Sequence, residues 1–228
     1  MESEQGKKPE VELRPDQMGD EAAKKDDHRR ASIATGSGIE FFPFAPTEDM
    51  IRLEDIVNAI SNKCRYTGQL KDGLFYSVAQ HSMFVSKILR AQKASPVVQL
   101  QGLLHDAPEA YGPDIASPIK QFVSVRYPGG EVLSYREHEG RVEKVIFDAL
   151  GIPHPMAHEV HVADAEAFRH EYRQLMPPLL WWRGDPPKGN YPDISRMDNH
   201  LARELFYRMY RGLMMECEEL SKRGTWGP

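Results

Sequence analysis

The sequence has few cysteines and no long hydrophobic segment. Cys64 and Cys217 stand far apart and lack Cys-x-x-Cys spacing, so neither a disulfide framework nor a thiolate zinc site is indicated. No apolar run approaches the roughly 20 residues that a membrane-spanning helix needs. The N-terminus MESEQGKKPEVELRPDQ also lacks the apolar segment of a signal peptide. We therefore expect a cytoplasmic protein with no membrane partner.

Excess positive charge is also missing. The chain has 29 Lys and Arg against 34 Asp and Glu, a formal net charge of -5. This balance argues against a basic surface that binds nucleic acid. The length of 228 residues, with 40% hydrophobic and 28% charged residues, is typical of a globular protein with one core.

The first 37 residues differ in composition from the rest of the chain. Residues 1–37 are mostly charged or small, and almost nothing apolar recurs at helical spacing. Such a segment buries too little surface to offset the entropy lost on ordering. We therefore predict a flexible charged tail over 1–37 and one domain over 38–228.

Within this domain, apolar residues recur at the 3.6-residue period of a helix. Leu53, Ile56 and Ile60 lie on one helical face, and Ser77 is placed to cap the next helix. No convincing run of alternating strand residues occurs, so we predict an all-α fold. The remaining helices are expected from residue 97 to about 112, and over 131–150, 155–176 and 194–222.

The stretch LLHDAPEAYGPD, residues 103–114, gathers a histidine and three carboxylates beside an apolar run. Glu109 follows His105 by four residues and Asp106 by three, which returns it to the same side of a helix. Burying an unpaired carboxylate is costly, and a bound metal ion is one way to offset that cost. A solvated polar cluster at a helix end is the alternative, because isolated His-Asp pairs are common.

Several motifs occur in order around this stretch: LEDIVNAISNKCRYTGQ, YSVAQHS, LLHDAPEAYGPDIASPIK and VADAEAF. A histidine, a His-Asp pair and a distant aspartate, all on predicted helices, resemble the HD-domain phosphohydrolase superfamily. The full order, over about residues 41–177, resembles its nucleotide-directed branch, which includes deoxynucleoside 5'-monophosphatases and viral dATP triphosphohydrolases. The resemblance implies a single HD-domain helical bundle.

The resemblance also implies a divalent cation bound by two imidazoles and two carboxylates. The implied metal ligands are His81, His105, Asp106 and Asp164. This mixed nitrogen and oxygen set suits several metals, so zinc, cobalt, manganese, iron and magnesium all remain open.

The same resemblance implies that Glu109 positions or deprotonates the attacking water. It also implies that Asp114 is a second acid, which acts as a proton shuttle or contacts a second metal. Arg65 matches the arginine that contacts the substrate phosphate, and Lys120 is a second phosphate-binding candidate. Pro113 precedes Asp114 where relatives usually have glycine, which places the position of Asp114 in question.

We expect a metal-dependent phosphohydrolase of deoxynucleotides that forms a homo-oligomer, most simply a triphosphohydrolase of the dATP type. A 5'-nucleotidase acting on monophosphates is the first alternative, and a noncatalytic nucleotide-sensing module is the second. His158 and His161 share helical spacing with Asp164 and point to a third, a dinuclear phosphodiesterase or oxygenase. Tyr66 or the Trp181-Trp182 pair is a candidate to stack on a base.

Overall fold

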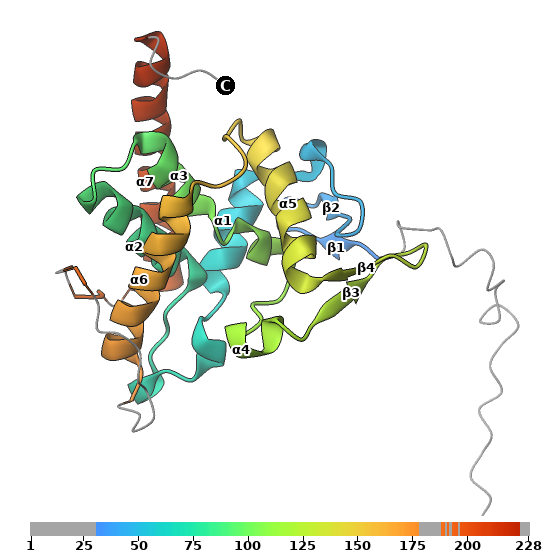
Figure 1. Cartoon of the computed structure of the whole chain (residues 1–228), viewed down its shortest axis with the longest axis horizontal. Helices are drawn as coiled ribbons and strands as arrows, with labels where there is room; N and C mark the ends of the chain where they lie inside the picture. The colour runs from blue at the N-terminus through green and yellow to red at the C-terminus, as the bar shows by residue number, and fades with distance from the viewer. Residues whose placement is uncertain (1–30, 178–187, 190, 192, 196, 224–228) are drawn as a thin grey trace, which may run out of the picture.

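The computed structural model describes residues 31–177, 188–189, 191, 193–195 and 197–223, and most of them are helical (Figure 1). The all-α prediction is confirmed. In this part of the chain no helix is both long and apolar enough to cross a membrane. The helices are α1 (Leu53–Asn62), α2 (Val78–Ala91), α3 (Pro96–Leu104), α4 (Ser117–Lys120), α5 (Tyr135–Ala149), α6 (His158–Leu175) and α7 (Asn199–Lys222).

Helix α2 lies at the centre of the fold. It packs against α1, α3, α6 and α7, and eleven of its fourteen residues are buried. Ser77 caps it as expected, because its hydroxyl accepts the Gln80 amide while the Gln80 side chain accepts the Ser77 amide. A Cβ on Gly102 in α3 would lie 2.3 Å from Leu89 of α2, so the glycine permits close contact between these helices.

Two small antiparallel sheets, which the sequence did not predict, flank the helices. Strands β1 (Ile33–Ala34) and β2 (Glu40–Phe41) form one, and β3 (Ser124–Arg126) and β4 (Val132–Ser134) form the other. Strand β4 occupies residues that we had placed at the start of the helix over 131–150. That helix, α5, begins only at Tyr135, because Ser134 caps it through a reciprocal pair of hydrogen bonds with Glu137.

The folded domain also includes residues that we had assigned to the tail. Strand β1 lies before residue 37, and Ser37 donates its amide and its hydroxyl to Asp55 of α1, at 2.7 and 2.6 Å. Residues 1–30 lie outside the described residues.

Helix α3 ends earlier than predicted, and this break forms part of the site. The chain leaves the α-helical path after Leu104 and continues as the 3-10 helix η6 (Ala107–Tyr111). Pro108 has no amide hydrogen for an α-helical bond and favours such a break. His105 and Asp106 lie in the junction, where neighbouring side chains turn toward the same space. Helices α6 and α7 likewise begin later than expected, at His158 and Asn199.

Candidate metal centre

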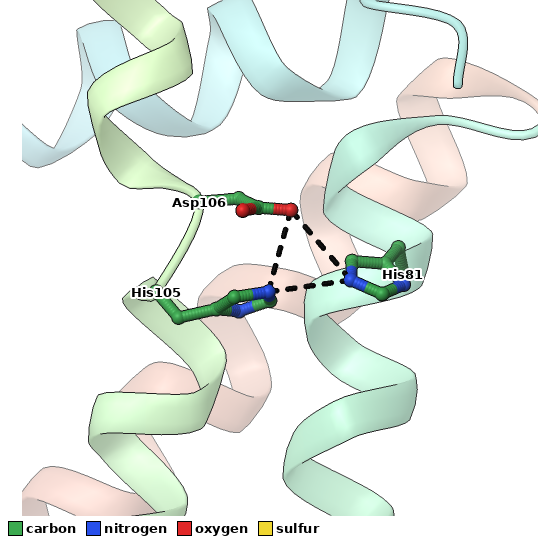
Figure 2. Close-up of side chains that lie close together, drawn as sticks. All are labelled: His81, His105 and Asp106. Atoms are coloured by element: carbon green, nitrogen blue, oxygen red, sulfur yellow. Dashed lines mark hydrogen bonds and ion pairs between the residues drawn. The ribbon is translucent and has the colours of Figure 1, made fainter. Parts of the chain in front are cut away.

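Three of the four predicted metal ligands lie within reach of one ion (Figure 2). The Nε2 atoms of His81 and His105 are 3.2 Å apart. A carboxylate oxygen of Asp106 lies 3.6 Å from the first and 3.3 Å from the second. His81 comes from the first turn of α2, and the other two come from the junction between α3 and η6. The packing of α2 against α3 therefore assembles the group, which is able to hold a metal ion.

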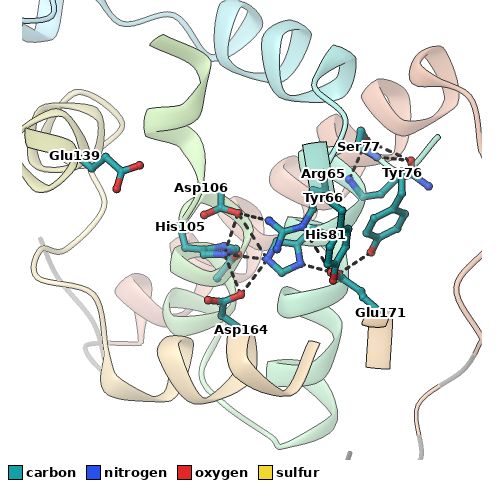
Figure 3. A network of polar contacts seen from close by, with 12 residues as sticks. Arg65, Tyr66, Tyr76, Ser77, His81, His105, Asp106, Glu139, Asp164 and Glu171 are labelled. Carbon is teal, nitrogen blue, oxygen red and sulfur yellow. Dashed lines mark hydrogen bonds and ion pairs between the residues drawn. The ribbon is translucent and has the colours of Figure 1, made fainter. Parts of the chain in front are cut away.

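Asp164 of α6 lies against the same two imidazoles. Its Oδ1 is 3.0 Å from Nε2 of His81 and 3.8 Å from Nε2 of His105 (Figure 3). Its side chain is 42% exposed, whereas His81 is fully buried. The structure therefore brings all four predicted ligands together, with Asp164 on the side that opens to solvent.

Hydrogen bonds orient both imidazoles for metal binding. Nδ1 of His81 lies 2.6 Å from a carboxylate oxygen of Glu171, and Nδ1 of His105 lies 2.9 Å from the carbonyl oxygen of Gly102. Each acceptor holds a proton on Nδ1, so Nε2 is the nitrogen that would bind a cation after losing its own proton. Both Nε2 atoms face the space shared with Asp106 and Asp164.

Glu171 is an important residue of the site that we did not predict. It is completely buried in α6, and besides His81 it accepts the hydroxyls of Tyr66 and Tyr76, each at 2.9 Å. Its place seven residues after Asp164, on the same face of a helix, was the available signal. A carboxylate behind a histidine is the usual outer partner of a metal-binding imidazole.

The charges of the group fit a divalent cation. Asp106, Asp164 and Glu171 bring three negative charges, and Arg65 supplies one positive charge near two of them. Burial alone would lower the pKa of His105, but Asp106 and Asp164 raise it to about 9. The pocket thus attracts protons to its imidazoles, and a cation with two positive charges would balance the remaining negative charge.

Arg65 is positioned by an unusual turn. Tyr66 and Thr67 both have positive φ values, 56° and 51°, which non-glycine residues rarely adopt. The turn directs Nη1 of Arg65 to within 3.1 Å of Asp106 and Nε to within 3.6 Å of Glu171. The backbone just before it pairs with the start of α2, where the Arg65 amide donates to the Tyr76 carbonyl. Arg65 therefore reaches the site from a backbone tied to the helix of His81.

Glu109 lies beside the proposed ligands in η6. It is buried, and one of its carboxylate oxygens has no hydrogen-bond partner. Burial, followed by the charges of Asp106 and Asp114, raises its pKa to about 9. The ammonium of Lys63 donates to the backbone carbonyls of Glu109 and Gly112. A residue of the α1–α2 connection thus holds in place the helix that carries Glu109.

Asp114 and Lys120 lie on the α5 side of the site. Tyr135 donates its hydroxyl to the carbonyl of Pro113 at 2.9 Å, which fixes the backbone next to partly exposed Asp114. The ammonium of Lys120 contacts Glu139 of α5 at 2.6 Å rather than any of the four ligands. Figure 3 shows Glu139 directed toward the cluster from across the site.

Comparison with known proteins gives a relationship but no activity. No family model matches the chain. It is 34% identical to the uncharacterized protein YfdR of Escherichia coli (strain K12) over 143 residues. These residues make up 63% of this chain and 71% of that protein. The chain belongs to the YfdR family. It is also similar to the uncharacterized protein RCAP_rcc00048 of Rhodobacter capsulatus, with 29% identity over 138 residues, 57% of this chain and 65% of the relative.

Other residues that we considered do not join the group of proposed metal ligands in this YfdR-family chain. His158 and His161 line a separate surface hollow with Glu166 and Arg169, and within the described ranges only the group of His81 meets the geometry of a metal site. Tyr66 lies beside Arg65 and donates to Glu171. Trp181 and Trp182 fall outside the described residues.

Proposed function

We propose that this chain is an HD-domain phosphohydrolase that acts on deoxynucleotides with a divalent cation. The observation that carries the proposal is the convergence of two oriented imidazoles and two carboxylates beside a partly buried arginine. The reaction that we favour is the hydrolysis of a deoxynucleoside triphosphate of the dATP type to deoxynucleoside and triphosphate. We place this activity in the cytoplasm, where such substrates occur.

His81, His105, Asp106 and Asp164 would hold the cation. A divalent ion bound there supplies Lewis-acid polarisation of a phosphoryl oxygen and makes a nearby water more acidic. Two nitrogen and two oxygen donors accept several metals, so zinc, cobalt, manganese, iron and magnesium all remain candidates.

Arg65 is suited to bind the phosphate that reacts. Burial opposes its charge, but Glu171 and Asp106 raise its pKa, so the guanidinium stays protonated. Nη1 contacts Asp106, and Nε lies 3.6 Å from a carboxylate oxygen of Glu171. These contacts hold the guanidinium in place, and the outer edge of a planar guanidinium binds phosphate oxygens with parallel hydrogen bonds.

Glu109 is suited to accept a proton from the attacking water. Its carboxylate oxygen without a partner lies in a buried environment that favours the protonated form. Water would add to the α-phosphorus while the bond to the 5'-oxygen breaks. With a divalent cation bound nearby, Glu109 would be ionised and would accept the water proton, which would then pass, directly or through Asp114, to the departing 5'-oxygen.

Lys120 bears on the choice between substrates. A triphosphate needs positive charge beyond the first phosphate, and Lys120 is the candidate from α4. Its ion pair with Glu139 means that a triphosphate has to compete with this carboxylate. The same contact supports the alternative, a 5'-nucleotidase that binds a single phosphate through Arg65 alone.

The decisive experiment incubates the cation-loaded protein with a panel of deoxynucleoside mono- and triphosphates and separates the products by chromatography. Deoxynucleoside and triphosphate from a dNTP would support the proposal. Turnover of monophosphates alone would favour the nucleotidase. Nucleotide binding without hydrolysis under any of the five cations would overturn both and favour a noncatalytic sensing module.

A further inference from the structure

A surface hollow between α2 and α7 lies outside the metal centre. It has a volume of about 420 Å³. Met83, Met209 and Leu213 contribute to a mostly apolar wall, and Lys87 and Arg208 contribute positive charge. Exposed apolar surface that is rimmed by polar residues often marks a site of protein contact.

Helix α7 carries an outward-facing row of residues with the spacing of a helix–helix seam. Leu201, Leu205, Arg208, Gly212 and Met215 follow one another at alternating intervals of four and three residues, the pattern of helices that pack side by side. Met215 is 64% exposed, although it is apolar. In Figure 1 the C-terminal turns of α7 extend past the neighbouring helices. Packing among the described residues therefore leaves this row largely uncovered.

Gly212 belongs to this row and lies near the middle of α7. A Cβ built on it meets nothing within 4 Å, so packing within the described chain does not require a glycine there. Glycine destabilises a helix interior. A second helix that crosses at this position would, however, gain close backbone approach from the missing side chain.

The charges of α7 are divided between its two halves. Residues 199–211 contain three arginines and one glutamate, whereas residues 212–222 contain three glutamates and one lysine. An antiparallel pair of these helices places each positive half beside a negative half, and a parallel pair does not. Charge complementarity therefore selects a second copy of this chain, in antiparallel orientation, as the occupant.

We propose that the protein forms a homodimer in which α7 pairs with α7 of a second copy and the two helices cross at Gly212. Arg208, four residues before the glycine, then lies opposite Glu216 of the other copy, four residues after it. Met209 likewise lies opposite Met215. In its own chain Glu216 contacts Arg90 at 2.5 Å, which keeps it at the edge of the hollow. The proposal does not depend on the phosphohydrolase assignment.

A mixing experiment tests the interface and its register. In a dimer of the Arg208→Glu variant, each new glutamate lies opposite Glu216 of the other copy. In a dimer of the Glu216→Arg variant, each new arginine lies opposite Arg208 of the other copy. Each variant alone should associate roughly 100-fold more weakly than the unaltered chain. An equimolar mixture of the two should recover a heterodimer, because one copy then carries two glutamates and the other carries two arginines. Sedimentation velocity measures all three samples.

Two exposed controls make the same charge changes away from the seam. Arg136→Glu on α5 and Glu159→Arg on α6 should leave the dimer intact. Met215→Lys, which introduces charge into the seam without changing Arg208 or Glu216, should weaken it. Circular dichroism of each variant checks that the fold is kept. A monomeric unaltered chain, or an assembly that none of the seam variants weakens, would overturn the proposal.

Discussion

His81 Nδ1 lies 2.6 Å from a carboxylate oxygen of Glu171, and both side chains are fully buried. Glu171 also accepts two tyrosine hydroxyls, so it needs the acceptor capacity of a charged carboxylate. Glu171→Gln leaves one oxygen acceptor for these donors and removes the charge that holds the proton of His81 on Nδ1. We expect a 10–100-fold loss of cation affinity, roughly the effect of losing such an outer partner.

Calorimetric titration with zinc or cobalt measures this affinity. Glu166→Gln is the matched control, because Glu166 lies on the same helix but accepts backbone amides of Lys188 and Gly189. The control should bind the cation as the unaltered protein does. Equal affinity in Glu171→Gln would contradict the role that we assign to this carboxylate.

His105→Ala and Glu109→Gln should separate cation binding from chemistry. His105 contributes an Nε2 atom to the ligand group, so its removal should abolish both bound cation and hydrolysis. Glu109 lies outside that group, so Glu109→Gln should keep the cation and lose roughly 10²–10⁴-fold in kcat. Metal content by mass spectrometry and product release are measured on the same samples. Full hydrolysis by either variant would rule out our assignment of the site.

The ionisation of Glu109 predicts a pH-dependent stability in protein stripped of cations. The folded state raises the pKa of Glu109 from the ordinary value of 4.5 to about 9. Between these values the unfolded chain releases a proton that the folded chain keeps, so stability is greatest below pH 4.5 and falls as the pH rises toward 9. Glu109→Gln cannot ionise and should be more stable than the unaltered protein at pH 7, by about 1–3 kcal/mol.

Urea unfolding in the presence of a chelator measures this difference. At pH 5 the difference should shrink to about 1 kcal/mol or less, because pH 5 lies only half a unit above the ordinary pKa of 4.5 that Glu109 has in the unfolded chain. A stability difference that is the same at pH 5 and pH 7 would show that Glu109 is not the group responsible.

Lys120 should matter more for a triphosphate than for a monophosphate. Its ammonium contacts Glu139 at 2.6 Å and would exchange this partner for a distal phosphate. Lys120→Ala should therefore raise KM about tenfold for the triphosphate, as expected for the loss of one charged contact, and change KM for the monophosphate less. Lys144→Ala on the exposed face of α5 is the control. Equal changes in KM for both substrates would remove Lys120 from distal phosphate binding.

Lys63 should position the helix that carries Glu109. Its ammonium donates to the carbonyls of Glu109 and Gly112. Lys63→Met leaves both carbonyls without this donor, and we expect a loss of about 1–3 kcal/mol in the free energy of unfolding. We also expect a lower kcat, while cation binding is kept. Lys93→Met, at an exposed position after α2, should change neither quantity. Cation loss in Lys63→Met would indicate a wider structural role.

Local patterns were sufficient for the helical class and for the four proposed ligands. The 3.6-residue period predicted α1 and α2. Ser77 was recognised as a cap because a serine just before a helical period bonds to backbone atoms that are close to it in the chain. His81, the His105-Asp106 pair and Asp164 stood in recognisable motifs. Their convergence followed from the packing of α2, α3 and α6, which the sequence pattern implied only through the resemblance.

Contacts between distant residues were decided by the tertiary structure alone. Glu171 and His81 are 90 residues apart, and Lys63 is 46 residues from Glu109, so no local pattern links either pair. The β3–β4 hairpin was missed because the chemistry of its turn outweighed the apolar period. The break after Leu104 was missed because a single proline, Pro108, outweighed that period. The sequence by itself determined which side chains have metal-binding chemistry. Only the fold determined which imidazole nitrogen is free, because burial beside a particular carboxylate fixes the position of the proton.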